Sequence, residues 1–323
     1  MSVAIGNHVA ESRAKEIERL RLKRRSVELS HLEAWLGRGR GSFHFENLEF
    51  LPHIIRGALR LTGMLARGER NALSPVVRNL VFDFENLPEE FDGFRILHLS
   101  DIHADGLFGL AETIADLIRD IEVDLCVLTG DYRFEIHGPC HSVYYNMEKI
   151  LPAVNSKRGI VGVLGNHDFA EEVPELERMG IKMLINESLE LRSGMSSIWL
   201  VGLDDPHYYG CDDLPAALSE VPDDAFKLLL VHTPEMLDDA AAADIDLYLC
   251  GHTHGGQICL PLIGPVLVNA SCPRKYTRGV WNYKGVQGFT SAGIGSSGVA
   301  VRFNCPPEVA VLELRKRDAA DSR

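Results

Sequence analysis

The stretch that decides the fold holds two histidines between glycines and reads Leu249-Cys250-Gly251-His252-Thr253-His254-Gly255-Gly256-Gln257. It follows an apolar run, and on extended backbone residues i and i+2 point to the same side, so both imidazoles can face one point. Neutral imidazole is a common ligand of divalent metals, and glycine lets the backbone approach a bound ion closely. Because a His-x-His pair alone is not specific, the prediction of a metal site depends on further ligands elsewhere in the chain.

Four other apolar runs also end in residues that can bind a metal. The runs cover residues 96–100, 123–129, 159–164 and 227–231. The residues that follow them are Asp101-Ile102-His103, Gly130-Asp131, Gly165-Asn166-His167-Asp168 and His232. Because the carboxyl ends of neighbouring strands converge at one edge of an open α/β sheet, we expect all five ends to meet in one pocket. Their restriction to Asp, His and Asn favours a metal site over five unrelated loop starts.

In this order the motifs resemble the signature of the calcineurin-like metallophosphoesterases, which is D-x-H, G-D, G-N-H-[DE], H and G-H-x-H. The resemblance covers residues 81–314, and the extended GHTHGGQ motif with the tail at residues 291–308 points to the bacterial branch of membrane-associated phosphodiesterases. It implies an α/β fold, a two-sheet αββα sandwich. Residues 110–121, 143–151 and 172–179 have helical patterns between the strands, which is typical of βαβ units. The short runs at residues 266–268, 286–290, 299–303 and 309–314 predict an antiparallel second sheet.

The resemblance also implies two divalent ions that share one carboxylate. One ion would be bound by Asp101, His103, Asp131 and His254, and the other by Asp131, Asn166, His232 and His252. A hydroxide that bridges the ions would attack a phosphodiester or pyrophosphate bond. His167 would meet the phosphate and protonate, or donate a hydrogen bond to, the leaving oxygen. Manganese is the metal we expect, with iron, zinc and cobalt as alternatives, because nitrogen and oxygen ligands accept all four.

The neighbours of these residues have two interpretations each. Asp168 either orients the His167 imidazole or caps a following helix, and Arg133 either contacts phosphate or forms a salt bridge. We expect ordinary structural roles for His98, His137, His141 and His207. The seven cysteines include Cys126 and Cys250 inside apolar runs. They predict buried free thiols in a reducing compartment and no disulfide framework.

The charge distribution separates an N-terminal extension from an acidic body. The net charge is -13, yet residues 1–70 hold 13 Lys and Arg against 8 Asp and Glu. An acidic catalytic part argues against nucleic acid as a partner, because phosphate backbones are held mainly by Lys and Arg. We therefore predict a basic helical extension at residues 1–80, a catalytic domain at 81–317 and a tail at 318–323.

The extension contains two different helical patterns. Residues 11–30 are dense in charge and predict a helix with a solvated charged face. Residues 50–67 are basic and amphipathic, with Pro52 at the start and Ile55 and Leu59 on one face. This second segment could lie on an anionic membrane, pack on the catalytic domain or contact a second subunit.

The expected location is cytoplasmic, with peripheral contact to the inner face of the membrane through residues 50–67. No stretch approaches the ~20 apolar residues that a transmembrane helix needs, and no secretory signal is evident. We expect that removing residues 1–75 spares hydrolysis of a small diester and abolishes binding to anionic liposomes. The oligomeric state is not readable from the sequence.

Together these observations predict a dinuclear metal-dependent phosphoesterase with a phosphate-ester substrate, which the basic extension allows to be lipid-linked. The alternatives are a catalytically silent scaffold with this fold and a phosphomonoesterase. A protein phosphatase is disfavoured, because Gly130-Asp131-Tyr132-Arg133 lacks the G-D-x-x-D-R-G continuation of that branch.

Overall fold

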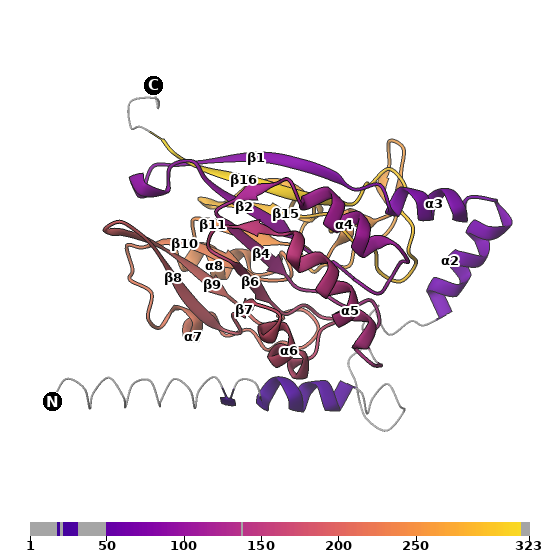
Figure 1. Cartoon of the computed structure of the whole chain (residues 1–323), viewed down its shortest axis with the longest axis horizontal. Coiled ribbons are helices and arrows are strands. Elements are labelled where there is room, and N and C mark those ends of the chain that lie inside the picture. The colour runs from indigo at the N-terminus through magenta and orange to yellow at the C-terminus, as the bar shows by residue number, and fades with distance from the viewer. Residues whose placement is uncertain (1–17, 20–21, 32–49, 137, 318–323) are drawn as a thin grey trace.

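The computed structural model describes residues 18–19, 22–31, 50–136 and 138–317, which form two stacked sheets with helices outside them (Figure 1). The first sheet contains, in spatial order, β1 (Val76–Phe84), β16 (Glu308–Lys316), β2 (Phe94–Leu99), β4 (Leu125–Thr129), β6 (Ile160–Val163) and β7 (Ile181–Met183). The second contains β14 (Gly279–Tyr283), β15 (Val286–Thr290), β11 (Leu247–Cys250), β10 (Phe226–Leu230), β9 (Ser196–Gly202) and β8 (Glu187–Ser193). Two small ribbons pair β3 (Glu122–Val123) with β5 (Asn155–Ser156) and β12 (Cys259–Leu260) with β13 (Gly264–Pro265).

Helices cover the outer face of each sheet. The first sheet is covered by α4 (Leu110–Ile118), α5 (His141–Ile150) and α6 (Val173–Arg178), and the second by α7 (Leu214–Leu218) and α8 (Leu237–Ala242). Short 3-10 turns lie at η2 (Glu89–Phe91), η3 (Leu151–Ala153), η4 (Ala170–Glu172), η5 (His254–Gly256) and η6 (Arg274–Tyr276). The predicted αββα sandwich is therefore confirmed.

Alternation along the strands builds three apolar layers. In β4, Leu125 and Val127 face the core between the two sheets, whereas Cys126 and Leu128 face the helices. Both faces of this strand are buried, which explains why its sequence is almost continuously apolar. The predicted strands at residues 96–100, 159–164 and 227–231 and the predicted helices are also present, each within a few residues of its expected bounds.

The prediction of an antiparallel second sheet built from the runs after the histidine pair is wrong, although β14 and β15 pair antiparallel with each other. β15 joins the second sheet parallel to β11, and β16 enters the first sheet between β1 and β2. Residues 266–268 and 299–303 form no strand beyond a single bridge between Ile258 and Phe303. Short apolar runs do not reveal strand direction, because a strand buried on both faces looks alike in either orientation.

Two helices, α2 (Phe50–Leu61) and α3 (Leu65–Ala72), lead into β1. Leu65 packs with Val301 and Phe303 of the catalytic body, and the half-buried Ile55 and Leu59 lie against the same cluster. Of the three options for residues 50–67, the structure thus shows packing on the body. β1 begins at Val76 and crosses the boundary expected after residue 80, and the division into an extension, a domain and a tail stays a prediction.

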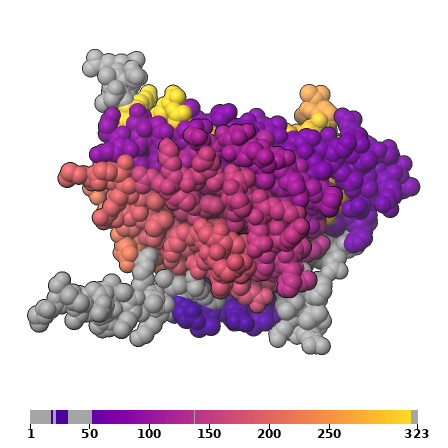
Figure 2. Space-filling model, viewed as in Figure 1, coloured from indigo at the N-terminus to yellow at the C-terminus, as the bar shows by residue number. Residues whose placement is uncertain are grey.

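A further helix at residues 22–31 lies against the body below α6 in the view of Figure 1, and Figure 2 shows the same indigo segment on the lower surface. Within the described ranges, no helix combines the length and the apolar character that crossing a bilayer requires.

Candidate metal centre

The predicted ligand residues come together at the carboxyl ends of strands from both sheets. Asp101 follows β2, Asp131 follows β4, Asn166 follows β6, and His232 and His252 follow β10 and β11. With His103, His167 and His254 they are at most 6% exposed. The convergence predicted from the sequence is therefore present, and the site lies between the two sheets.

Asp131 occupies the middle of the cluster. Its Oδ2 lies 3.2 Å from Nε2 of His232, 3.6 Å from Nε2 of His103 and 3.9 Å from Nε2 of His167. Its Oδ1 accepts a hydrogen bond from the backbone N–H of His167 at 2.9 Å. One carboxylate thus lies beside three of the imidazoles.

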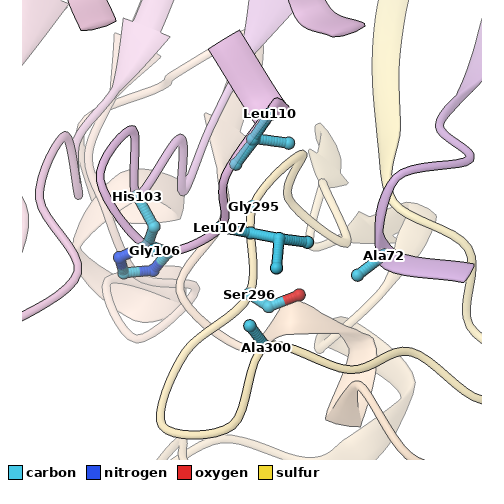
Figure 3. Close-up of a pocket in the computed structure, with 8 residues that line it drawn as sticks. All are labelled: Ala72, His103, Gly106, Leu107, Leu110, Gly295, Ser296 and Ala300. Carbon is cyan, nitrogen blue, oxygen red and sulfur yellow. The ribbon is translucent and has the colours of Figure 1, made fainter. Parts of the chain in front are cut away.

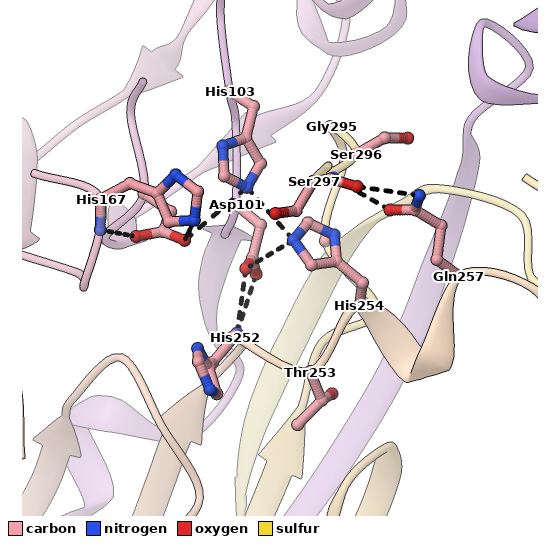
Figure 4. Close-up of polar contacts among 12 residues, drawn as sticks. Asp101, His103, His167, His252, Thr253, His254, Gln257, Gly295, Ser296 and Ser297 are labelled. Atoms are coloured by element: carbon pink, nitrogen blue, oxygen red, sulfur yellow. Dashed lines mark hydrogen bonds and ion pairs between the residues drawn. The ribbon is translucent and has the colours of Figure 1, made fainter. Parts of the chain in front are cut away.

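On one side of Asp131, donor atoms of Asp101, His103 and His254 all lie within 4.8 Å of one another. His103 Nε2 and His254 Nε2 are 3.1 Å apart, and His254 Nε2 is 3.4 Å from Asp101 Oδ1 (Figure 4). On the other side, His252 Nδ1 lies 3.0 Å from Asn166 Oδ1, and the ring centroids of His232 and His252 are 5.1 Å apart. The site therefore has two halves that meet at Asp131.

The expectation that both histidines of the 252–254 pair face one point is wrong. His254 faces His103, whereas His252 faces Asn166. The backbone is not extended here, because His252 and His254 have φ values of 70° and 49°. The carboxylate of Asp101 accepts the backbone N–H of His252 at 3.0 Å, which holds this turned conformation.

Left-handed backbone recurs at the site. Asp101, His103 and Asp131 have φ values of 52°, 42° and 57°, in addition to the two histidines above. Non-glycine residues in this region cost ~1–3 kcal/mol each and persist where their surroundings enforce them. Gly251 permits one close approach, because a Cβ at that position would overlap the carboxylate of Asp101. The backbone is thus shaped around the carboxylates.

Backbone carbonyls orient three of the imidazoles. The carbonyl of Arg133 lies 2.6 Å from His103 Nδ1, that of Thr129 lies 2.6 Å from His232 Nδ1, and that of Phe134 lies 2.7 Å from His167 Nδ1. A carbonyl only accepts, so each Nδ1 donates its proton, and Nε2 is the nitrogen of each ring that faces the site.

The donor set fits divalent cations. His232 Nε2 is buried and makes no hydrogen bond of good geometry, although it lies 3.2 Å from Asp131 Oδ2. Burial raises the pKa of Asp101 to about 6, and the charge of Asp131 adds to the shift. Burial would lower the pKa of His232, but the Asp131 carboxylate raises it to about 10. Two buried carboxylates beside imidazole nitrogens thus attract positive charge, which metal ions supply.

Asp168 has neither of its two expected roles. Its Oδ2 accepts backbone N–H groups of Asp131 at 2.8 Å and Gly165 at 2.7 Å, and its Oδ1 accepts that of Tyr132 at 2.8 Å. It therefore joins the two loops that carry Asp131 and Asn166. The salt-bridge interpretation holds for Arg133, whose Nη1 lies 2.8 Å from Glu172 Oε1.

The other histidines are mostly structural. His98 is buried with Nε2 2.8 Å from Thr129 Oγ1, as expected, and His141 is exposed at the start of α5. His137 lies outside the described residues. His207 is closer to the site than expected, since its ring centroid lies 4.5 Å from that of His252 and its Nδ1 is 2.8 Å from Glu235 Oε1.

Two buried arginines beside the site were not predicted. Arg302 places Nη2 3.1 Å from His254 Nδ1 and donates to the carbonyl of His254 through Nη1 at 3.0 Å. Arg24 contacts the loop of Asn166 through the carbonyl of Gly165. Arg302 stands in the family-like tail, but only the tertiary contact links it to His254.

A small pocket adjoins the first half of the site (Figure 3). His103, Leu107 and Leu110 form one side, and Ala72 of α3 and Ala300 form another. Its lining is mostly apolar, and of the predicted ligands only His103 is among the lining residues, so this pocket is not the metal site itself.

Comparisons with known proteins agree with this geometry. Residues 94–256 match the family described as calcineurin-like phosphoesterase. Metallophosphoesterase YkuE of Bacillus subtilis is 31% identical over 241 residues, which cover 71% of this chain and 82% of that protein. Phosphodiesterase YaeI of Escherichia coli is 30% identical over 231 residues, covering 68% and 82%. Metallophosphoesterase YkoQ of Bacillus subtilis is 26% identical over 255 residues, covering 76% and 92%.

Proposed function

The chain belongs to the calcineurin-like phosphoesterase family and is a metal-dependent phosphoric ester hydrolase, and we propose that its centre binds two divalent ions to cleave phosphodiester or pyrophosphate bonds. The observation that carries the proposal is the position of Asp131, whose Oδ2 lies within 3.9 Å of three imidazole nitrogens between two groups of donors. A shared carboxylate is what a two-metal centre requires.

The proposed ligand sets follow the two halves of the site. Asp101, His103 and His254 would hold one ion, Asn166, His232 and His252 would hold the other, and Asp131 would contact both. When bound, such ions activate water and neutralise the charge on a phosphate undergoing in-line attack. The protein contributes rigid donors, since the imidazoles are oriented by backbone carbonyls and the carboxylates by backbone N–H groups.

His167 is the proposed acid. Its Nδ1 donates to the carbonyl of Phe134, and its Nε2 faces the site 3.9 Å from Asp131 Oδ2. Its ring lies beside the proposed ligands, with its centroid 4.9 Å from that of His103. We assign it protonation of, or a hydrogen bond to, the leaving oxygen.

The test is turnover with metal analysis. We expect the purified enzyme with Mn²⁺ to hydrolyse bis-p-nitrophenyl phosphate faster than p-nitrophenyl phosphate and to hold two metal ions per chain. His167→Ala should lower kcat by ~10²–10⁴-fold without changing the metal content. His141→Ala, at an exposed histidine, is the control. Preference for the monoester would favour a phosphomonoesterase, absence of metal-dependent turnover a silent scaffold, and one ion per chain would contradict the dinuclear centre.

Manganese is the proposed metal, with iron, zinc and cobalt as competitors. No thiol among the described residues belongs to the donor groups, because Cys250 Sγ lies 3.3 Å from Thr290 Oγ1 and burial raises the pKa of its thiol. Nitrogen and oxygen donors do not separate these metals by affinity alone, so the supply in the cell contributes to the choice. Activity measured with each metal in turn, after removal of bound metal, orders them.

We also propose a cytoplasmic enzyme that contacts the inner face of the membrane through residues 50–67, with a lipid-linked phosphate ester as substrate. Ile54, Leu61 and Met64 are 60%, 91% and 40% exposed there. The arginines at positions 56, 60 and 67 are exposed in the same segment, and basic side chains suit an anionic leaflet.

The hairpin of β12 and β13 supports the same proposal. Leu262 and Ile263 at its tip are fully and 71% exposed, and Pro265 packs against Gly256 next to the turn that carries His254. Apolar side chains that stand in solvent near a site for phosphate suit a substrate with an acyl or isoprenoid tail.

Removing residues 1–75 is no longer a clean test, because it also removes α3 and Arg24, which contact the body. Instead, Leu61→Ser/Met64→Ser and Leu262→Ser/Ile263→Ser should lower binding to anionic liposomes while hydrolysis of the small diester is kept. Ile55 and Leu59 stay unchanged, so the packing of α2 is preserved. Liposome binding equal to that of the parent in both variants would refute the membrane contact.

A further inference from the structure

The helix at residues 22–31 docks on the catalytic body through one face. Arg24, Val27, Glu28 and His31 follow helical spacing, and Arg24 and Glu28 are 0% and 9% exposed. The ring of His31 meets that of Tyr208 with centroids 4.6 Å apart, and Val27 packs beside it. The expectation of a solvated charged face is therefore wrong for these positions.

Arg24 uses its whole guanidinium group in this contact. Nη1 lies 2.5 Å from Asp204 Oδ1, and Nε lies 2.8 Å from Glu28 Oε1. Nη2 donates to the carbonyls of Gly165 at 3.1 Å and Asp168 at 2.8 Å. The plane also lies over the ring of Tyr209, with the guanidinium carbon 3.5 Å from the centroid. The two carbonyls bracket Asn166 and His167.

Glu28 adds a second contact to the same loop. Its Oε1 accepts the backbone N–H of Ala170 at 2.8 Å. On its inner side the loop is held by carboxylates, since Gly165 N–H donates to Asp168 at 2.7 Å and His167 N–H donates to Asp131 at 2.9 Å. The backbone of residues 165–170 is thus held from inside by the site and from outside by the helix.

The charges in this contact are balanced. Burial opposes the charge of Arg24, but Asp204, Tyr209 and Glu28 keep its pKa above the ordinary value. A buried arginine is tolerated only when ion pairs and hydrogen bonds satisfy it, and here three nitrogens have partners. Lysine could not make the same set of hydrogen bonds, because its ammonium is a single point charge and not a planar group with several fixed donors.

We propose that Arg24 is a positioning residue, which holds the backbone of residues 165–168 so that Asn166 and His167 face Asp131. The inference rests on the proposed function, since it places Arg24 behind the same centre. It makes the N-terminal helix part of the active enzyme in addition to any role in location.

The experiment compares variants of the full chain. Arg24→Lys keeps the positive charge but not the planar, multi-donor guanidinium. Arg24→Met/Asp204→Asn removes the ion pair of these two residues, so that Asp204 is not left without its cation, and Glu28 keeps its hydrogen bond from the backbone N–H of Ala170. Arg25→Met changes the neighbouring exposed arginine and is the matched control. The measurements are hydrogen exchange in metal-free protein, Mn²⁺ titration, and kcat and KM for the chromogenic diester.

We expect faster exchange at residues 160–172 in both Arg24 variants and unchanged exchange at residues 247–256. Displacement of a catalytic group by ~1 Å can cost ~10²-fold in rate, so kcat should fall by about that factor while KM stays near the parent value. One of two Mn²⁺ ions should bind ~10-fold more weakly, as for other changes behind a ligand. Arg25→Met should match the parent in every measurement.

Three results would count against the inference or its premise. Unchanged exchange and kcat in the double variant would overturn it and leave the proposed function intact. Exchange that rises equally at residues 160–172 and 247–256 would show that Arg24 stabilises the fold as a whole, which also overturns positioning. If the parent shows no metal-dependent hydrolysis, the proposed function fails, and local exchange still decides whether Arg24 holds the loop.

Discussion

Two fully buried arginines lie behind the two halves of the site. Arg302 supports the half with His254, and Arg24 supports the loop of Asn166. Both donate to backbone carbonyls: Arg302 to those of Ala292 at 2.8 Å and Gly295 at 2.5 Å, among others, and Arg24 to those of Gly165 and Asp168. The fold thus uses the same device twice to fix a ligand-bearing loop.

The two arginines differ in how their charge is balanced. Arg24 forms ion pairs with Glu28 of its own helix and with Asp204 of the body, and these carboxylates keep its pKa above the ordinary value despite burial. Burial lowers the pKa of Arg302, against which Cys305 and Asp101 act only in part. Arg302 therefore contacts the side chain of a proposed metal ligand, His254. Arg24 reaches the site only through the backbone carbonyls of Gly165 and Asp168. The half with His254 is thus supported by a charged side chain in direct contact with a ligand, and the half with Asn166 by a helix docked on the outside of the loop.

The largest effect is expected from a substitution that disrupts both halves of the site. Asp131→Asn removes the carboxylate that lies beside His103 in one half of the site and His232 in the other. Metal assistance is worth several kcal/mol of transition-state stabilisation, so hydrolysis should fall by at least ~10³-fold. Metal analysis should show fewer than two ions per chain. A variant that keeps two ions and parental turnover would contradict the shared role of Asp131.

Arg24→Ala separates the halves through stability. It leaves Asp204 buried without its cation, and breaking a buried pair in this way costs ~3–5 kcal/mol. Chemical denaturation should show this loss, and Arg24→Met/Asp204→Asn should recover much of it. Equal stability of the single and double variants would mean that the ion pair does not govern docking.

Arg302→Met tests the other half. The partner of His254 Nδ1 is lost, and removing a group behind a ligand typically weakens metal binding by ~10–100-fold. Mn²⁺ titration should show that one ion is weakened while hydrogen exchange at residues 160–172 is unchanged. Faster exchange in that loop would erase the distinction between the two arginines.

Lowering the pH should decrease the free energy of unfolding through His98, a buried histidine that belongs to neither half of the site. Burial lowers the pKa of His98 to about 3, below the ~6.5 of an unfolded histidine. Between these values the unfolded chain binds more protons, so the contribution of His98 to stability decreases as pH falls below ~6.5, by up to ~1.4 kcal/mol per unit.

The variant His98→Gln keeps a polar partner for Thr129 but cannot titrate. Its stability should therefore approach or exceed that of the parent as pH falls from 6.5 to 5, measured by urea unfolding. A pH-independent difference for His98→Gln would contradict a neutral buried imidazole.

The smallest effect is expected at an exposed arginine of the N-terminal part. Arg56 Nη2 lies 3.4 Å from Glu69 Oε1 with its side chain 52% exposed. Exposed pairs contribute ~0–1 kcal/mol, so Arg56→Ala should leave the melting temperature and the turnover of the small diester near parental values. A loss as large as that at Arg24 would contradict the contrast between buried and exposed arginines.

The sequence allowed the ligand residues to be predicted because each follows an apolar strand, and strand ends converge by a general rule of α/β sheets. The directions of His252 and His254 could not be predicted, since left-handed φ values depend on the Asp101 carboxylate 151 residues away. The role of Asp168 could not be predicted for the same reason, because its partners are backbone N–H groups of a loop 36 and 37 residues away.

The two N-terminal helices bury the opposite kinds of residue from those that their sequence patterns predict. The charged helix at residues 22–31 buries Arg24 and Glu28, whereas the amphipathic α2 leaves Ile54 and Leu61 in solvent. Charge density indicates a solvated face only when no buried counter-ion is available, and Asp204 lies 180 residues from Arg24. A local pattern therefore cannot reveal which charges are paired inside the fold.

The position of β16 has a consequence for synthesis of the chain. Residues 308–316 insert between β1 and β2, parallel to one and antiparallel to the other. While the ribosome is still translating the middle of the protein, these two neighbours have no strand to join them, and their edges stay open to aggregation or chaperones. Closure of this sheet therefore waits until residues 308–316 have been synthesised, and premature termination before residue 308 should give an insoluble product.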